Sequence, residues 1–277
     1  MQIELWWGQI RRAYLKKFRP GYVQRMEALR QGECQGCPIE ILDPRDLKYF
    51  QNVCGYRWKE SDDPFAWRSR LPLVRAGLAE AILISVVMAS VSGLAYWLWR
   101  PLVLVPLVLW FFLIWFFRDP RRIPPADPNT IVSPADGLVV AIEEIEDEFV
   151  GPAWMVGIFL SVFNVHLNRS PADAILVGQT YRPGKFLNAL RPQSARENER
   201  LELRLAMAEA PYYRFRVRQI AGAIARRIVC LSRIGDRLQR GEKFGMIKIG
   251  SRTELVLPRN AHVKLTIQMG EKVKAGT

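Results

Sequence analysis

Three short segments carry the side chains that a reaction on a serine requires. Gly250-Ser251 lies between two apolar, strand-like runs in FGMIKIGSRTELVLP, His166 lies in NVHLNRSP, and Asp136 lies in VSPADG. A nucleophilic serine needs an imidazole to accept its proton and a carboxylate to fix the imidazole tautomer. Only His166 and His262 could serve as that base, because the chain contains two histidines. The alternative is structural, with a β-bulge, a turn aspartate and a buried core histidine, and from these residues alone it is favoured.

The order of several motifs in the second half of the chain is more specific than the trio. FFRDPRR, VSPADG, NVHLNRSP, YRPGKF, NER and the stretch from GAIARRIVC to GEKFGMIKIGSR follow one another between Phe116 and Arg252. In this order and spacing they resemble the short, membrane-anchored form of the phosphatidylserine decarboxylase proenzyme. The resemblance extends from Phe116 to the C-terminus and leaves most of the first 75 residues outside it.

The resemblance implies a self-cleaving enzyme. Ser251 would attack the carbonyl of Gly250, and elimination of the resulting ester would cut the chain and convert Ser251 into a covalent pyruvoyl cofactor. His166 would be the base, and Asp136 would accept its other N–H. The small chain, residues 251–277, would stay associated with the large chain, residues 1–250. The pyruvoyl carbonyl would then serve as the electron sink when phosphatidylserine loses CO2 to give phosphatidylethanolamine.

The chain departs from the family pattern at two positions. Many of these decarboxylases have a second histidine three residues before the one that matches His166, and here that residue is Phe163. The proton donor for decarboxylation is therefore open between His166, a water molecule and a tyrosine. Arg252 replaces the threonine of the longer bacterial forms but suits the short form. The resemblance also leads us to expect one further short strand after Thr277.

Other assignments remain open. Arg182 and Lys185 are candidates for binding the lipid phosphate or carboxylate, although a solvated basic loop would have the same composition. The substrate could also be an ether lipid or another serine-headed phospholipid. A third alternative is a non-enzymatic membrane adaptor with a lipoyl-like β domain. A lipoyl or biotinyl carrier would need a lysine in a tight turn, whereas Lys248 lies within a predicted strand.

Composition and hydropathy indicate that the protein associates with a membrane. The chain has 277 residues, 49% of them apolar, and its 40 basic and 27 acidic residues give a net charge of +13. Such a charge suits nucleic acid or anionic membrane lipids. The apolar block 81–117, interrupted only by Arg100-Pro101, favours the lipids and argues against nucleic acid. It predicts two membrane segments, 81–99 and 102–117, in a helical hairpin, although a hairpin that enters only one leaflet is an alternative.

The block divides the chain into three predicted regions. Residues 1–75 form a basic extension at the membrane surface, with amphipathic helices near 5–18 and 23–29. Residues 76–118 form the hairpin, and residues 119–277 form the catalytic domain. Arginines flank both outer ends of the hairpin, so we expect the catalytic domain on the cytoplasmic side of the cell membrane.

The cysteines of the extension have an uncertain role. Cys34, Cys37 and Cys54 supply three of the four ligands of a zinc site, and nearby glycines suit the turns of such a site. A fourth ligand is not evident, and reduced thiols without metal are the favoured interpretation. Cys230 lies in an apolar run typical of a core.

The region after Ile131 has the alternation of short strands and is predicted to be mainly β, with a barrel-sandwich-like fold. The predicted strands are 138–145, 154–163, 174–181, 201–207, 213–220, 244–249, 253–257 and 262–268. A weak internal repeat relates residues 234–241 to residues 269–276. It resembles turns of lipoyl and biotinyl carrier domains, and we expect it to shape two equivalent turns.

Overall fold

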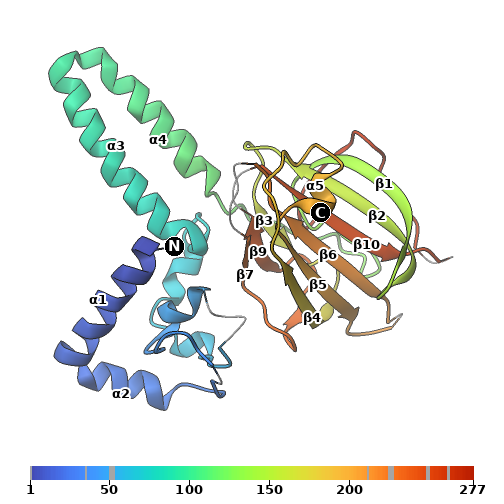
Figure 1. The fold of residues 1–277 in the computed structure, drawn as a ribbon, viewed down its shortest axis with the longest axis horizontal. Helices are drawn as coiled ribbons and strands as arrows, with labels where there is room; N and C mark the ends of the chain where they lie inside the picture. The colour runs from blue at the N-terminus through green and yellow to red at the C-terminus, as the bar shows by residue number, and fades with distance from the viewer. Residues whose placement is uncertain are drawn as a thin grey trace. The chain divides into compact units, whose positions relative to one another are not determined.

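The computed structural model describes residues 2–34, 36–49, 54–210, 212–223, 228–247, 250–260 and 263–277. It divides into two compact units, Met1–Arg70 and Leu71–Thr277, which are treated separately below (Figure 1). Two residues discussed above, Lys248 and His262, lie outside the described ranges.

The first unit is helical with a small core. Helix α1 spans Gln2–Phe18 and α2 spans Pro20–Ala28, where the proline occupies the first turn and its missing N–H costs nothing. Short 3-10 helices follow at Pro44–Tyr49, Glu60–Asp62 and Ala66–Arg70. Helices are therefore present at both predicted places.

The apolar block forms two helices that lie side by side in the second unit. After a 3-10 turn at Arg75–Gly77, α3 spans Leu78–Leu98. A second 3-10 turn, Arg100–Val103, leads into α4, Leu104–Phe116. The Trp110 indole N–H donates to the Ser85 hydroxyl over 2.9 Å and joins the two helices.

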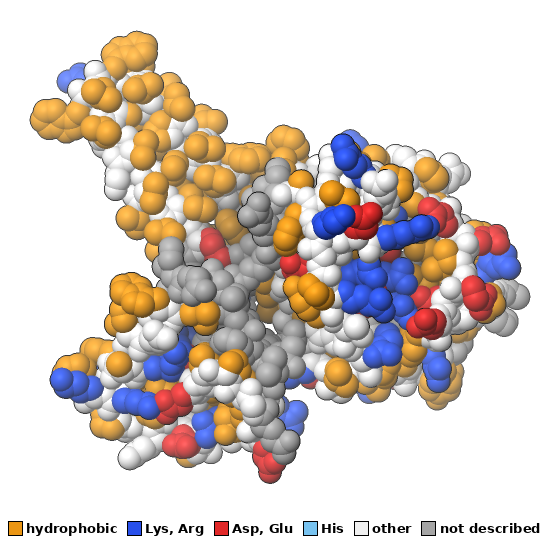
Figure 2. Space-filling view, viewed as in Figure 1, with side chains coloured by type: hydrophobic (Ala, Val, Ile, Leu, Met, Phe, Trp, Pro, Cys, Tyr) orange, Lys and Arg blue, Asp and Glu red, His pale blue; other side chains and the backbone are white. Residues whose placement is uncertain are grey.

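Only one of these helices meets the requirements for a membrane span. Within the described ranges, Glu80–Leu98 is the single helix long and apolar enough to cross a bilayer, and α4 is shorter. Hydrophobic side chains cover the exposed surface of both (Figure 2). A membrane hairpin therefore remains a prediction, whereas its break at Arg100-Pro101 is where the sequence indicates.

The rest of the second unit is mainly β, and all the described pairs between its strands are antiparallel. An eight-stranded sheet has the order β11-β1-β2-β10-β6-β5-β4-β8 and curls into a half-barrel, and a three-stranded sheet has the order β3-β9-β7. The large sheet consists of β1 Gly137–Asp147, β2 Gly151–Leu160, β4 Ala174–Arg182, β5 Arg200–Met207, β6 Arg214–Ile220, β8 Arg237–Leu238, β10 Ser251–Pro258 and β11 Lys272–Val273. The small sheet consists of β3 Leu167–Arg169, β7 Ile228–Cys230 and β9 Lys243–Ile247, and a short helix, α5, spans Ser194–Glu197.

One predicted strand is wrong. Residues 263–268 are not a strand, although Val263, Leu265 and Ile267 alternate and pack against the main core. The alternation predicted the buried face correctly, but no neighbouring strand pairs with this segment. Periodicity reports which side chains are buried and not whether the backbone finds a partner.

The internal repeat does form two equivalent turns. Four glycines at its ends have positive φ: Gly235, Gly241, Gly270 and Gly276. In one copy the Arg240 N–H donates to the Asp173 carboxylate over 3.0 Å, and in the other the Ala275 N–H donates to the Asp136 carboxylate over 2.8 Å. Both aspartates end an SPAD tetrapeptide. One copy of the repeat thus holds β8 beside β4, and the other holds β11 beside β1.

Candidate active site

Ser251 is the first residue of β10 and lies in the interior of the domain. It pairs with Leu160 of β2, and its neighbour Arg252 pairs with Ile220 of β6. The side chain is fully buried, and its Oγ has no hydrogen-bond partner among the described residues. A buried hydroxyl without a partner costs free energy. This is the property expected of a reactive group rather than of a packing residue.

Gly250, directly before it, has a backbone conformation that a side chain disfavours. Its φ is +61°, in the left-handed region. The chain therefore turns sharply at the residue whose carbonyl precedes Ser251. The Gly250–Ser251 peptide is held between this turn and the first pairs of β10.

His166 lies against Gly250, and it directly precedes β3. Its Nδ1 is 2.9 Å from the Asn164 carbonyl oxygen, which can only accept, so Nδ1 carries the proton. The other ring nitrogen, Nε2, accepts the Gly250 N–H over 3.3 Å. The imidazole therefore directs its lone pair at the N–H of Gly250, the residue before Ser251.

Burial keeps this imidazole neutral. Desolvation lowers the pKa of His166 to about 4, and the charge of Arg118 adds to the effect, while the hydrogen bond to the Asn164 carbonyl opposes it. The Phe116 ring, at the end of α4, covers the imidazole with 4.6 Å between ring centroids. His166 is therefore neutral at physiological pH, and the last turn of an apolar helix helps to make it so.

A glycine forms the wall behind the Gly250 carbonyl. A Cβ placed on Gly222 would lie 1.7 Å from the Gly250 oxygen and 2.8 Å from its carbonyl carbon. Nothing but hydrogen fits between these two segments. The absence of a side chain at Gly222 thus sets the position of the carbonyl that precedes Ser251.

The motifs YRPGKF and NER hold that wall in place. The Lys185 N–H donates to Glu197 O and the Glu199 N–H donates to Lys185 O, over 2.7 and 3.0 Å. The Asn198 amide nitrogen donates to Ala221 O over 2.7 Å, and the Ala221 N–H donates to Glu199 O over 2.9 Å. Since Ala221 precedes Gly222, the two motifs act through backbone bonds on the residue that contacts Gly250.

A buried amide network fixes the strand that carries Ser251. Asn168, two residues after His166, donates to the Thr253 hydroxyl over 3.0 Å and to Pro134 O over 3.2 Å. Gln219 donates to the Asn168 carbonyl oxygen over 2.7 Å. All three side chains are fully buried. Such networks fix geometry because each unpaired member would be costly.

Asp136 is buried nearby but is bonded to other groups. Its carboxylate pairs with Arg122 over 2.9 Å and accepts the Ala275 N–H described above. The expected hydrogen bond between Asp136 and His166 is not present between these two described side chains, since Nδ1 is bonded to Asn164. A role for Asp136 in orienting His166 thus remains a proposal.

Phe163, which occupies the position of the second family histidine, packs against α4. Its ring is largely exposed and meets Phe112 of α4 edge-on, with 5.8 Å between ring centroids. The Arg118 guanidinium donates to the Phe163 carbonyl over 2.7 Å. Because phenylalanine cannot transfer a proton, it supplies contact with α4 and no acid or base.

Arg182 ends β4, which lies three strands from the strand of Ser251, and Lys185 follows in the next loop. Across the sheet Arg182 pairs with Arg200, Arg200 with Ile220, and Ile220 with Arg252. Three strand spacings separate the ends of this row, about 14 Å. Both side chains are exposed, and each has an acidic neighbour: Glu202 lies 3.9 Å from Arg182, and Glu197 lies 2.8 Å from Lys185. Their assignment to substrate binding is untested.

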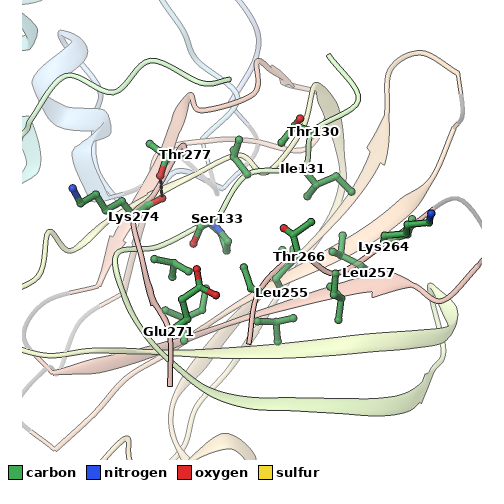
Figure 3. A pocket seen from close by; sticks show the side chains of 18 of the residues that line it. Thr130, Ile131, Ser133, Leu255, Leu257, Lys264, Thr266, Glu271, Lys274 and Thr277 are labelled. Carbon is green, nitrogen blue, oxygen red and sulfur yellow. Dashed lines mark hydrogen bonds between the residues drawn. The ribbon is translucent and has the colours of Figure 1, made fainter. Parts of the chain in front are cut away.

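A large cavity lies along the same strand. It measures about 860 Å³, and its walls include Leu255, Leu257 and the segment 263–267 (Figure 3). Ser251 does not line it and is four residues from Leu255, about 13 Å along a strand. The cavity therefore adjoins the core and not the Gly250–Ser251 peptide.

Sequence reasoning missed three residues that build this site: Asn168, Asn198 and Gly222. Asn168 could have been found, because it is two residues from His166 and so shares its face of a strand. Asn198 and Gly222 act through backbone contacts that have no periodic signal in the sequence.

Comparisons with known proteins agree with the geometry. The Phosphatidylserine decarboxylase family profile matches residues 109–277. A protein of Rhodopirellula baltica is 53% identical over 231 residues, covering 83% of this chain and 96% of the relative. Relatives from Geotalea uraniireducens and Cupriavidus pinatubonensis are 44% and 40% identical, cover 66% and 72% of this chain, and are themselves covered over 84% and 88% of their lengths. All three are named phosphatidylserine decarboxylase proenzyme. The chain therefore belongs to the phosphatidylserine decarboxylase family.

Proposed function

We propose that this protein is a proenzyme that cuts itself between Gly250 and Ser251 and then decarboxylates phosphatidylserine to phosphatidylethanolamine in phospholipid biosynthesis. Family membership supports the reaction. The observation that supports the self-cleavage is the buried Ser251 Oγ, which has no hydrogen-bond partner among the described residues and directly follows Gly250, whose N–H is bonded to His166 Nε2.

Self-cleavage begins with the serine hydroxyl. His166 Nε2, released from the Gly250 N–H, accepts the Oγ proton while Oγ bonds to the Gly250 carbonyl carbon. The proton then passes to the nitrogen of residue 251 as the C–N bond of the peptide breaks, which leaves an ester and a free amine on that residue. Loss of the Cα proton of residue 251 then expels the Gly250 carboxylate. Addition of water and departure of ammonia leave a pyruvoyl group at the start of β10. Gly222 and the left-handed Gly250 hold the carbonyl during these steps.

The residues around Ser251 suit a pyruvoyl group. The position is buried, its own oxygen is free of hydrogen bonds, and it begins a strand that is paired on both sides. When formed, this group supplies an electrophilic carbonyl that can take up the electrons left by departing CO2. His166 is the neutral base beside it, and the Asn168 network holds its strand.

The contact between α4 and His166 supports a lipid as substrate. Phe116 ends an apolar helix and covers the imidazole, so the reactive peptide lies next to the segment proposed to meet the membrane. We infer that the domain works at the cytoplasmic face of the cell membrane, where anionic lipids would attract its positive charge.

Intact mass under denaturing conditions tests the proposal. Wild-type protein should give two chains, residues 1–250 and 251–277, the second one ammonia lighter than a chain with an N-terminal serine. Ser251→Ala should remain a single chain. Thr277→Ala, a change in the same small chain at an exposed residue, should be cut like wild type. An uncut wild-type protein, or a small chain with an intact serine, would refute the proposal.

Release of CO2 from vesicles tests the substrate separately. Diacyl and ether-linked phosphatidylserine should be offered to the cut protein and to Ser251→Ala in the same detergent. Turnover of the diacyl lipid by the cut protein alone is the expected result. A cut protein that decarboxylates neither lipid would reject the assigned reaction while leaving self-cleavage intact.

A further inference from the structure

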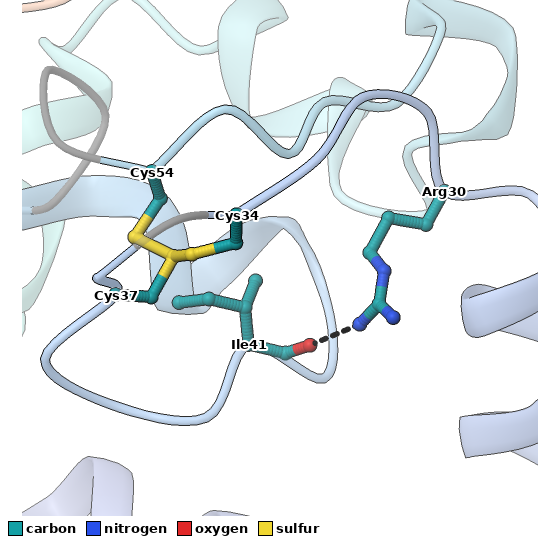
Figure 4. The surroundings of a disulfide bond; sticks show 5 residues. All are labelled: Arg30, Cys34, Cys37, Ile41 and Cys54. Atoms are coloured by element: carbon teal, nitrogen blue, oxygen red, sulfur yellow. Dashed lines mark hydrogen bonds between the residues drawn. A yellow bond between two sulfur atoms is a disulfide. The ribbon is translucent and has the colours of Figure 1, made fainter.

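Three cysteines of the first unit meet at one point. Cys34, Cys37 and Cys54 place their sulfur atoms within 4.8 Å of one another, and Cys37 Sγ is in contact with both others (Figure 4). Cys54 is almost fully buried in a small apolar cluster that includes Ile41 and Leu47. Three thiols from two separate segments thus share one partly enclosed position.

The backbone is shaped to bring them together. The segments before Cys34 and after Cys54 pair through Gln31 and Arg57, whose N–H groups donate to each other's carbonyls over 2.8 and 2.9 Å. Between these segments only glycine fits. A Cβ on Gly32 would lie 2.3 Å from Gly55 O, and a Cβ on Gly55 would lie 2.0 Å from Glu33 O.

A turn in the chain brings Cys34 and Cys37 together. Gly36, between Cys34 and Cys37, has a φ of +81°. The turn brings two cysteines that are three residues apart onto the same side of the chain, as in the knuckles of zinc sites. The convergence of the three thiols therefore depends on special backbone geometry at three glycines.

Disulfide chemistry does not account for a group of three. A cysteine sulfur forms one disulfide bond, so a bridge from Cys37 to either partner leaves the third thiol beside it without a role. A single metal ion can bind all three thiolates at once. With zinc–sulfur bonds of about 2.3 Å, ligand sulfurs in a tetrahedral site lie about 3.8 Å apart. The three sulfurs here lie within 4.8 Å of one another with Cys37 Sγ in direct contact with both others, so they would move apart to admit the ion.

We propose that Cys34, Cys37 and Cys54 bind a zinc ion that stabilises the first unit. Within the described ranges no further His, Cys, Asp or Glu belongs to the cluster, so the fourth coordination position is open to water or another external ligand. The core of this unit is small, and a bound metal adds its binding free energy to the stability of a small fold. The site is separate from the chemistry at Ser251.

Metal analysis of the full-length protein tests the site. The protein is purified in detergent with a reducing agent and without chelator, and its zinc content is measured by mass spectrometry. We expect about one zinc ion per chain, as for a structural site. The single variants Cys34→Ser, Cys37→Ser and Cys54→Ser should each lose most of it. Cys230→Ala is the matched control, because this buried thiol lies outside the cluster, and it should retain the metal.

Two further measurements keep the proposal falsifiable if a serine variant folds poorly. Cobalt(II) added to wild-type protein stripped of zinc should give thiolate-to-metal charge-transfer absorption, which the Cys230→Ala variant should share. Gly55→Ala keeps all three thiols but blocks the close approach, and it should weaken zinc retention at least tenfold. Wild-type protein that binds no more metal than Cys34→Ser, or a disulfide from Cys37 in protein whose thiols were blocked inside the cell, would overturn the proposal.

Discussion

Replacing Gly222 by alanine tests whether the wall behind the Gly250 carbonyl controls self-cleavage. The new Cβ would lie 1.7 Å from the Gly250 oxygen, whereas real Cβ contacts are essentially never shorter than 3.0 Å. One of the two segments must therefore move by at least the difference, about 1.3 Å. A misplacement of about 1 Å at a reacting centre can cost about 100-fold in rate. We expect self-cleavage of Gly222→Ala to be slower by at least that factor.

The rate can be followed during cell-free synthesis, by the conversion of the full chain into residues 1–250 and 251–277. Gly178→Ala is the matched control in the same domain. Its new Cβ would meet only the side chain of Arg204, which is exposed and can swing away. Thermal unfolding of both variants separates a local shift from general misfolding. A Gly222→Ala protein that is cut at the wild-type rate would refute the assignment.

Three other perturbations address the base and its surroundings. If the carboxylate orients His166, Asp136→Asn should slow self-cleavage about 100-fold or more. Asp173→Asn, its counterpart in the turn repeat, should be cut at the wild-type rate. Equal effects of the two changes in the cleavage time course would mean that both aspartates act only by holding the turns. In uncut Ser251→Ala protein, stability should fall with acid, because His166 has a pKa of about 4 when folded and about 6.5 when unfolded. Neutral His166 therefore favours the folded state fully above pH 6.5, and the advantage disappears as pH falls toward 4. At pH 5 the free energy of unfolding should be lower by 1.5 pKa units, about 2 kcal/mol. Urea unfolding at pH 7 and pH 5 should show this difference, and an added His166→Gln change should abolish it. Phe116→Ala should cost about 3 to 5 kcal/mol of stability and, by letting water reach the imidazole, should shrink this acid effect in the same assay.

The sequence predicts the β domain well because its strands alternate. The long strands β1, β2, β4, β5, β6 and β10 were all expected, with ends that differ by a few residues. The short strands β3, β7, β8 and β11 were missed, since two or three residues carry no measurable period. Their positions are decided instead by the turn repeat and by pairing with distant segments.

The site was predictable by residue type but not by arrangement. His166 does lie beside the residue that precedes Ser251, since its Nε2 accepts the Gly250 N–H, whereas the pairing of Ser251 and His166 as nucleophile and base stays a prediction. The partners of His166 could not be read in the same way, because its nearest acceptor is the carbonyl of Asn164, and every residue has a carbonyl. Gly222 could not be predicted either, because the close approach of two backbone segments at a glycine leaves no motif in the sequence.

The placement of Ser251 at the start of β10 has a consequence for how the cut protein persists. β10 lies between β2 and β6 in the middle of the large sheet, and β11 adds a second attachment at its edge. Cleavage before β10 would leave the sheet intact but divide it between two molecules. Refolding would then require a bimolecular encounter of the two chains, whereas the first folding was unimolecular. A mature protein of this design is kept by the slowness of its unfolding, so its lifetime at the membrane would depend on a rate and not on an equilibrium.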